Sequence, residues 1–308
     1  MDCKKGRYEQ MKASVIIPVF NETNLDIILK SLQNQQNIEK ASFEVIIVND
    51  GGRDLYQLEN HHFGYPIKYV EHEENLGRSV ARNTGARHSE SDFLIFMDGD
   101  RIPNPEFIVR HINAENEYTG NKVIIGNPIE LLCPDIHLIR NAIDTMFDDG
   151  SHKIWKYAYN QSYAETICKI FTKKRAECYV EWAALFSANF SIKKELYWQA
   201  GGFDENYCQW GYENMDFGIQ LQERNIGFYF LENNINLHIF HKQNRGVNLI
   251  GKEYILDKYK KRNDIVRFFD FLDGNISLYD FTGINDEVSK STYFSTTKFG
   301  SKYKYLFK

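Results

Sequence analysis

The carboxylates Asp98 and Asp100 stand one residue apart, directly after the apolar run 93–97. A short apolar run predicts a buried strand. In an extended backbone residues i and i+2 project to the same side, so both carboxylates can point at one position beyond the strand. Two hard oxygen ligands with open positions around them suit Mg²⁺ or Mn²⁺ shared with the phosphates of a substrate. The alternative is a polar turn, because Asp-Gly is also a common turn dipeptide.

The elements that must position this pair alternate between strands and helices. Apolar runs predict strands at residues 14–20, 43–48, 67–70 and 93–97. Helical spacing of apolar residues predicts helices at 25–32 and 80–88. This order indicates an α/β fold with a mostly parallel, Rossmann-like sheet covered by helices on both faces. Ligands bind beyond the carboxyl ends of such strands, where Asp50 and the pair at 98 and 100 are expected.

Composition narrows the class of protein. The chain has 308 residues, of which 43% are hydrophobic, and its net charge of -5 argues against a nucleic-acid partner. No apolar run approaches the length of a membrane span, and the first residues are too polar for a signal peptide. The five scattered cysteines favour free thiols in a reducing compartment. We therefore expect a cytoplasmic protein, which at most rests against the inner face of a membrane.

The loop after the first predicted strand excludes two kinds of nucleotide site. It contains Asn21, Glu22 and Thr23, with neither a P-loop nor the glycine-rich dinucleotide motif. A nucleotide here would be held mainly through its base, its ribose and a metal ion.

Five motifs then follow in order: V-I-I-P-V-F-N-E at 15–22, V-N-D-G-G at 48–52, N-L-G-R at 75–78, A-R-N-T-G at 81–85 and D-G-D at 98–100. Their order and spacing resemble those of family 2 glycosyltransferases of the GT-A fold, over roughly residues 14–241. The resemblance implies a UDP-sugar donor, a divalent metal on the D-x-D motif, and transfer of one sugar to an acceptor.

The same resemblance assigns the nucleotide pocket. It implies that Pro18, Phe20 and Glu22 line the pocket and that Asp50 accepts a hydrogen bond from uracil. For Asp50 the alternative is a turn residue before two glycines.

Phosphate and metal contacts are implied in the same way. Arg78 and Arg82 suit the diphosphate, because a guanidinium group matches phosphate oxygens, although a solvated surface role fits Arg78 equally well. Asp98 is expected at the ribose or the metal, and Asp100 is expected to ligate the metal directly. Arg101 extends the motif without an assigned role.

A second, narrower resemblance covers residues 182–243. The run E-N-M-D at 213–216, with His238 placed 25 residues after Glu213, is similar to bacterial chondroitin and hyaluronan polymerase domains. The E-N pair is also similar to polypeptide N-acetylgalactosaminyltransferases. These likenesses imply that His238 is a metal ligand and that Glu213 binds hydroxyls of the acceptor or the donor sugar.

Asn214 departs from the pattern of the inverting relatives. There an aspartate at this position acts as the general base, and an amide cannot accept the proton. Either Glu213 or Asp216 serves instead, or the enzyme is retaining, or catalysis has been lost. Glu213 and Asp216 are three residues apart at a predicted helix start, so they could share one face. A helix start also favours negative charge for structural reasons alone.

Two tryptophans are candidates for stacking on a sugar ring, Trp182 and Trp210, although a core position is at least as common. Residues 181–192 are predicted to form a strand pair over the sugar pocket.

The expected organisation has three parts. Residues 1–12 lead into a GT-A domain at 13–250, with a nucleotide-binding half at 13–101 and an acceptor half at 102–250. Residues 251–308 follow as a C-terminal helix, at 254–271, and a basic aromatic tail. Such a tail could touch a membrane surface or a partner protein, and a plain flexible terminus is the alternative.

The sequence thus predicts a metal-dependent transfer of a hexose or N-acetylhexosamine from a UDP-sugar in the synthesis of a surface or capsular glycan. A glycan, a lipid-linked oligosaccharide and a peptide all remain open as acceptors. The alternatives are a non-catalytic UDP-sugar-binding protein and a retaining peptide or protein glycosyltransferase.

Overall fold

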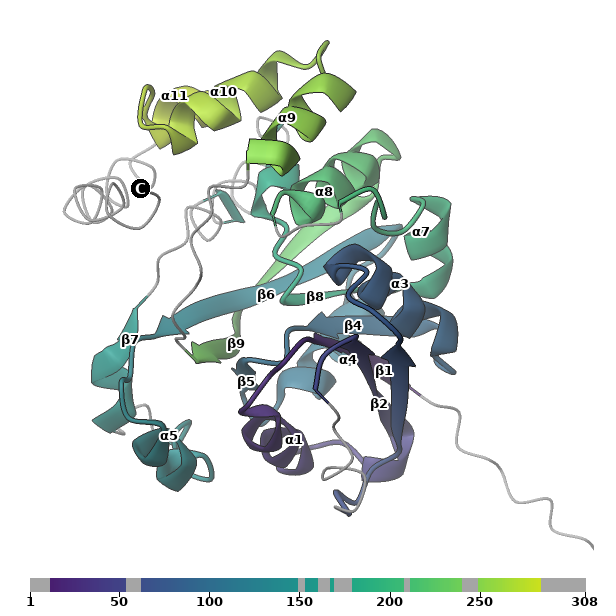
Figure 1. Ribbon diagram of the computed structural model, residues 1–308, viewed down its shortest axis with the longest axis vertical. Coiled ribbons are helices and arrows are strands. Elements are labelled where there is room, and N and C mark those ends of the chain that lie inside the picture. Colours follow the sequence, from purple (N-terminus) through teal and green to yellow (C-terminus); the bar gives the residue numbers. More distant parts are fainter. Residues whose placement is uncertain are drawn as a thin grey trace, which may run out of the picture.

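A computed structural model describes residues 12–53, 62–148, 153–159, 167–168, 179–207, 211–239 and 249–283 (Figure 1). Its strands form a nine-stranded sheet in the order β3-β2-β1-β4-β8-β6-β9-β5, with β7 paired to β6. The strands are β1 Ala13–Val19, β2 Phe43–Asp50, β3 Ile67–His72, β4 Phe93–Met97, β5 Arg101–Pro103, β6 Lys122–Leu131, β7 Ala158–Tyr159, β8 Asn189–Lys193 and β9 Gly227–Ile239. The α-helices are α1 Leu25–Gln33, α3 Arg78–His88, α4 Phe107–Glu117, α5 Ile136–Ala142, α7 Lys194–Gln199, α8 Glu213–Glu223, α9 Leu249–Lys258, α10 Asn263–Leu272 and α11 Leu278–Thr282.

The first half of the chain confirms the predicted α/β alternation. β3, β2, β1 and β4 pair in parallel, and helices cover both faces of this part of the sheet. Ile16 of β1 packs with Ala86 of α3 on one face, whereas its neighbour Ile17 packs with Leu29 of α1 on the other. A side chain at Gly85 would meet Ile16, since an added Cβ would lie 2.4 Å from Cγ2. Close packing of α3 on β1 therefore depends on this glycine.

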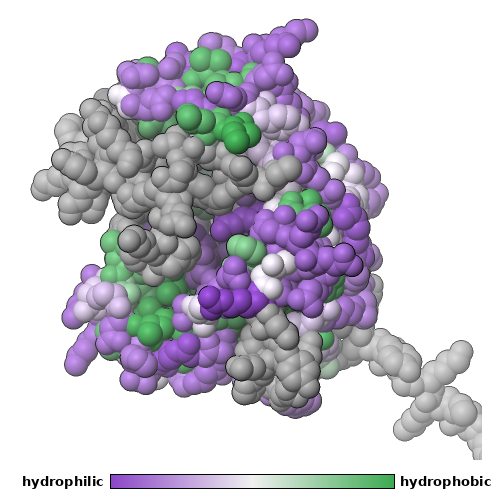
Figure 2. Space-filling model, in the orientation of Figure 1, coloured by the Kyte–Doolittle hydropathy of each residue, from purple (hydrophilic) through white to green (hydrophobic). Residues whose placement is uncertain are grey.

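The second half of the sheet is mixed. β8 runs antiparallel to β4 and β6, β6 runs parallel to β9, and β5 runs antiparallel to β9. These pairings bring β5, which follows the carboxylate pair, beside the end of β9. Figure 2 shows a largely hydrophilic surface, with hydrophobic residues gathered over α5 and β7 and over the C-terminal helices.

Two predicted elements differ from the structure. The segment 181–192 is not a strand pair, because Glu181–Ala184 is a 3-10 helix and only Asn189–Lys193 is a strand. Trp182, Ala183 and Ala184 are all buried, and an apolar run of this kind fits a buried strand and a buried helical turn equally well.

The predicted helix at 254–271 is two helices, α9 and α10. A polar run at residues 260–264 interrupts its apolar pattern. The tail from residue 284 lies outside the described residues, so its predicted contacts stay a prediction, as does the predicted division into domains. No helix in the part of the chain that the structure describes is long and apolar enough to cross a membrane.

Candidate functional site

The carboxylate pair lies at the carboxyl end of β4, as the sequence predicts. β4 ends at Met97, and the turn through Asp98 and Asp100 leads directly into β5. A Cβ added at Gly99 would lie 2.6 Å from Cγ1 of Val19, at the end of β1. The turn is therefore packed against the neighbouring parallel strand, at the edge where such sheets bind ligands.

Asp98 is joined to Glu213 through one arginine. Nη2 of Arg82 donates to Oδ1 of Asp98 at 2.9 Å, and Nη1 donates to Oε1 of Glu213 at 3.2 Å. The Arg82 side chain is fully buried and stacks over Phe203, with Cζ 5.1 Å from the ring centroid. In this conformation the guanidinium group pairs with Asp98 and Glu213, and its predicted contact with the diphosphate stays a prediction. Its role is to hold the motif on β4 against α8.

Arginines also determine the charge of Asp98. Burial alone would raise the pKa of this carboxyl, but Arg82, with smaller contributions from Arg78 and Arg101, outweighs burial and lowers the pKa. Arg78 is exposed at the first position of α3, close enough to Asp98 to act on it. A guanidinium group in that position is free to meet phosphate oxygens from solvent, so its predicted role stays a prediction.

Asp100 belongs to a second network. Nε2 of His238 lies 3.1 Å from Oδ2 of Asp100, and Nδ1 lies 2.6 Å from Oε2 of Glu130. Burial would lower the pKa of His238, but hydrogen bonds to the two carboxylates raise it to about 9. This raised pKa favours the protonated imidazole, which can donate to both carboxylates. Ligation of a metal through Nε2 would release that proton.

The charge of the combined networks fits a divalent cation. Besides the imidazole they contain four carboxylates and two guanidinium groups: Asp98, Asp100, Glu130, Glu213, Arg82 and Arg101. With His238 neutral and the carboxylates ionised, these groups carry a net charge of -2, which one Mg²⁺ or Mn²⁺ would balance. Oxygen and imidazole ligands suit either ion.

Two of the three predicted metal ligands are in contact with each other. Asp100 and His238 are in contact, whereas Asp98 is engaged by Arg82. Among the described residues no three histidine, cysteine, aspartate or glutamate side chains form a group that could hold a metal ion. Phosphate oxygens and water would have to supply the remaining ligands, as is usual for Mg²⁺.

Asp50 has a structural role at the end of β2. Its Oδ1 accepts the backbone N–H of Leu76 at 3.0 Å, and its Oδ2 accepts that of Gly77 at 2.8 Å. Nδ1 of His72 lies 2.8 Å from Oδ1. The carboxylate thus fixes the turn that begins α3, a structural role different from the local turn before two glycines that the sequence offered as the alternative. Contact with uracil stays a prediction and would have to share Oδ2.

The other predicted nucleotide contacts follow β1. Pro18 lies within β1, and Phe20, just beyond it, is 52% exposed, so its ring is accessible for stacking. Oε1 of Glu22 accepts the backbone N–H of Asn24 at 2.9 Å, which stabilises the turn before α1. Their contacts with a nucleotide stay predictions.

The prediction that Trp182 stacks on a sugar ring is wrong. Its side chain is fully buried, donates from Nε1 to Oδ2 of Asp264 at 3.0 Å, and packs on Phe268 with ring centroids 5.2 Å apart. Trp182 anchors α10 to the body of the protein. Trp210 lies outside the described residues.

Glu213 and Asp216 do not share a functional face. Glu213 points to Arg82, whereas Asp216 is fully buried with its Oδ1 2.8 Å from Nζ of Lys258. Asp216 therefore joins α8 to α9, and the prediction that it could act as the base is wrong. Nδ2 of Asn214 donates to the backbone oxygen of Leu185 at 2.6 Å, so this hydrogen bond holds the Asn214 amide against the segment that contains Leu185.

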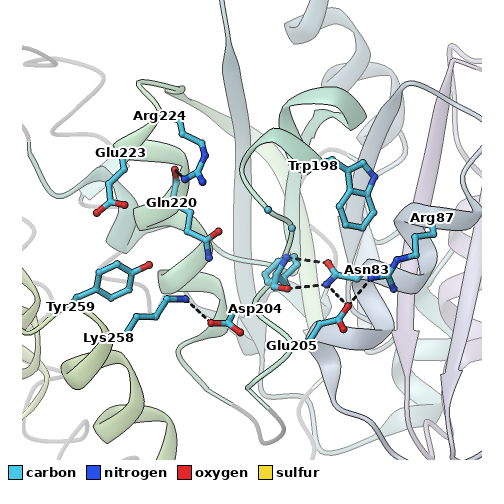
Figure 3. Close-up of a pocket in the computed structure, with 13 residues that line it drawn as sticks. Asn83, Arg87, Trp198, Asp204, Glu205, Gln220, Glu223, Arg224, Lys258 and Tyr259 are labelled. Carbon is cyan, nitrogen blue, oxygen red and sulfur yellow. Dashed lines mark hydrogen bonds and ion pairs between the residues drawn. The ribbon is translucent and has the colours of Figure 1, made fainter.

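A cleft of about 670 Å³ lies between α3, α7, α8 and α9 (Figure 3). Its polar groups mostly pair with one another: Lys258 binds Asp204 at 2.6 Å, and Arg87 binds Glu205 at 2.9 Å. No member of the carboxylate and histidine networks lines it. The cleft is therefore a junction between helices, separate from the candidate site.

Sequence reasoning missed Glu130 and assigned no role to Arg101. Glu130 lies near the end of β6, after mostly apolar residues, and this single acidic residue was the signal from which the sequence could have predicted it. The parallel register of β6 and β9 pairs Glu130 with His238, and the antiparallel register of β5 and β9 pairs His238 with Arg101. One row across three strands thus carries all three side chains.

Comparison with known proteins finds two glycosyltransferase families along the chain. The family described as Glycosyl transferase family 2 matches residues 14–129, and the family described as N-terminal domain of galactosyltransferase matches residues 170–242. An uncharacterized glycosyltransferase of Bacillus subtilis, YfnE, is 28% identical over 283 residues, which cover 81% of this chain and 71% of the relative.

The predicted likeness to bacterial polymerases is confirmed. Chondroitin synthase of Pasteurella multocida is 25% identical over 239 residues, covering 73% of this chain and 24% of the synthase. Hyaluronan synthase of the same species is 27% identical over 248 residues, covering 70% of this chain and 23% of the synthase. The chain thus spans about a quarter of either synthase. The likeness to polypeptide N-acetylgalactosaminyltransferases stays a prediction.

The fold has solved counterparts. The structure of S. aureus TarS 1-349 in complex with UDP-GlcNAc superposes with a TM-score of 0.54 at 17% identity, covering 79% of this chain and 64% of TarS 1-349. The structure of the same protein with UDP superposes with a TM-score of 0.52 at 19% identity, covering 74% of this chain and 60% of TarS 1-349. The predicted GT-A fold is confirmed.

Proposed function

We propose that this chain, in which a glycosyl transferase family 2 domain matches residues 14–129, is a glycosyltransferase that moves a hexose or N-acetylhexosamine from a UDP-sugar to an acceptor hydroxyl with the help of a divalent metal. The observation that carries this proposal is the contact between Asp100 and His238 at the ligand-binding edge of the sheet. TarS, whose fold this chain shares, has been solved with UDP and with UDP-GlcNAc, which supports a UDP-sugar as donor.

The proposed donor site combines the two networks. Mn²⁺ or Mg²⁺ at Asp100 and His238 would neutralise charge on the diphosphate as it leaves. Glu130 holds the imidazole by Nδ1 and thereby directs Nε2 toward Asp100. Arg82 keeps Asp98 and Glu213 in fixed positions. Arg78 supplies a solvent-facing cation near the same edge.

The acceptor side is less constrained by geometry. Glu213 begins α8, and its Oε2 accepts the backbone N–H of Gly211 at 3.0 Å. With Asn214 tied to Leu185 and Asp216 paired with Lys258, Glu213 is the carboxylate of this motif that faces the site. Either it accepts the acceptor's proton in an inverting reaction, or the reaction is retaining and the leaving phosphate accepts it.

The acceptor and the biological setting are also part of the proposal. Likeness to the two Pasteurella synthases supports a growing glycan as acceptor, in the synthesis of a surface or capsular polysaccharide in the cytoplasm. Asn214 favours a second candidate, a retaining transfer to a peptide or protein, because the E-N pair resembles enzymes of that kind.

A donor screen tests the proposal. UDP release is measured with Mn²⁺ for the UDP forms of glucose, galactose and their N-acetylated derivatives, with and without glycan, lipid-linked and peptide acceptors. We expect one preferred donor and release that stops when the metal is chelated. NMR of the product then gives the anomeric configuration, which separates inversion from retention. Binding of UDP-sugar without turnover against every acceptor would contradict the transferase assignment.

A further inference from the structure

Arg101 is a buried cation with unsatisfied hydrogen-bond donors. Its side chain is 7% exposed, and Nη2 approaches Oε1 of Glu130 at 3.5 Å, at the limit of a hydrogen bond. Nε and Nη1 are buried and donate to no partner among the described residues. A buried donor left in this state destabilises the folded protein, and more so when it is charged. Such a group calls for an explanation, and a bound ligand is one.

The position of Arg101 indicates which ligand. It is the cross-strand partner of His238 in the β5–β9 pair, so both side chains lie on the same face of the sheet. It is also close enough to Asp98 to lower the pKa of that carboxyl. The unsatisfied nitrogens therefore lie beside the Asp100–His238 pair, where a diphosphate is expected if the proposed function holds.

The chemistry of the side chain favours phosphate. A guanidinium group is always charged and matches phosphate oxygens, whereas the nearby carboxylates are engaged by Arg82 and His238. In a buried site a hydrogen bond from a cation to an anionic oxygen is about twice as strong as one between neutral groups. Arg78, by contrast, is exposed and screened by solvent.

We propose that Arg101 donates hydrogen bonds from its unsatisfied nitrogens to the β-phosphate of the UDP-sugar and stabilises that phosphate as the leaving group. In the transfer step the acceptor oxygen bonds to the anomeric carbon as the bond from that carbon to the β-phosphate oxygen breaks. The electron pair of the broken bond stays on the phosphate, where Arg101 stabilises the new charge. The acceptor's proton passes to Glu213 or, in a retaining reaction, to the phosphate itself.

The inference rests on the proposed function, and binding of UDP and UMP tests the two separately. Calorimetry with excess Mn²⁺ compares wild type, Arg101→Gln and Arg101→Lys. The control is Arg110→Gln, which alters a half-exposed arginine paired with Glu106 on α4. We expect Arg101→Gln to lower the affinity for UDP by about tenfold or more. The affinity for UMP, which lacks the β-phosphate, should fall by less than about threefold. Arg110→Gln should change neither affinity.

The possible outcomes are distinct. Failure of wild type to bind UDP would overturn the proposed function. Normal binding by wild type, with an unchanged ratio of UDP to UMP affinity in both Arg101 variants, would overturn the role of Arg101. An equal loss of affinity for UDP and UMP would also overturn the role of Arg101, because it would indicate that the residue is structural. If circular dichroism shows that Arg101→Gln is unfolded, Arg101→Lys decides, since it keeps the charge beside Glu130.

Discussion

The imidazole of His238 lies 3.1 Å from the carboxylate of Asp100, and the contact joins residues 138 positions apart in the chain. Strand pairing makes it possible, because β9 lies between β5 and β6 and so receives a carboxylate from each side. Asp100 precedes β5, and Glu130 lies near the end of β6. The imidazole is thereby fixed at both nitrogens before any ligand binds.

Glu130 should determine how well His238 binds a metal. Glu130→Gln leaves an amide that cannot hold the imidazole as a carboxylate does, so the affinity for Mn²⁺ should fall by about tenfold or more. Calorimetric titration of Mn²⁺ in the presence of UDP measures this. Glu253→Gln, an exposed change on α9, is the control and should leave the affinity as it is. Equal affinities in wild type and Glu130→Gln would show that this carboxylate does not orient the ligand.

Arg82 should be essential for stability as well as activity. Arg82→Lys replaces a buried guanidinium group that bridges Asp98 and Glu213 with a single ammonium group. Disrupting a buried pair is expected to lower the free energy of unfolding by about 3 kcal/mol, and sugar transfer should be lost. Arg87→Lys on the same helix alters an exposed ion pair with Glu205 and should lower the free energy of unfolding by less than about 1 kcal/mol. Urea unfolding compares them, and similar losses in both variants would contradict the bridging role.

The carboxylates of α8 should separate into one functional and one structural group. Glu213→Gln should abolish transfer, whereas Asp216→Asn should keep a measurable turnover number but lower the free energy of unfolding by about 3 kcal/mol, because it leaves Lys258 without its buried partner. Steady-state kinetics and urea unfolding of both variants check this. Loss of turnover in a folded Asp216→Asn would return Asp216 to the list of candidate bases.

Restoring an aspartate at position 214 should not improve the enzyme. The Asn214 amide donates to the backbone oxygen of Leu185, and a carboxylate there would face that oxygen without a proton to donate. Asn214→Asp should therefore lower the free energy of unfolding by about 1–3 kcal/mol and leave the rate of transfer no higher. A faster and equally stable variant would indicate an inverting enzyme with a weakened base.

His111 should make the protein sensitive to acid. It is fully buried on α4 against Asn189 and Ser191, and burial lowers its pKa from 6.5 to about 3. Below pH 6.5 the unfolded chain therefore binds a proton that the folded chain does not. The stability that neutral, buried His111 contributes to the folded state is therefore complete above pH 6.5 and is lost as the pH falls toward about 3.

The slope of that loss can be measured. We expect the free energy of unfolding, measured with urea between about pH 7 and 5, to fall more steeply for wild type than for His111→Gln, which has no titrating group at this position. The difference in slope should reach up to about 1.4 kcal/mol per pH unit. Parallel pH profiles for the two proteins would show that His111 does not control the acid sensitivity.

The first half of the fold could be predicted because its signals are local. β1, β2 and β4 are buried and mostly apolar runs, and the carboxylate pair follows β4 directly. The contact of Arg82 with Glu213 could not be predicted, because it depends on how α8 packs against α3, and the motif alone is compatible with a phosphate contact. Trp182 was misassigned for a similar reason, since burial by α10 is a long-range effect.

Binding of UDP to wild type and to Asp100→Ala, each with Mn²⁺ and again after chelation, tests the central claim most directly. Asp100 is the carboxylate that meets His238 at the proposed diphosphate site. Calorimetry should show UDP binding to wild type that is lost on chelation, and Asp100→Ala should bind UDP only as weakly as the metal-free wild type does. UDP affinity that is the same in all four conditions would contradict a metal and diphosphate site at Asp100 and His238.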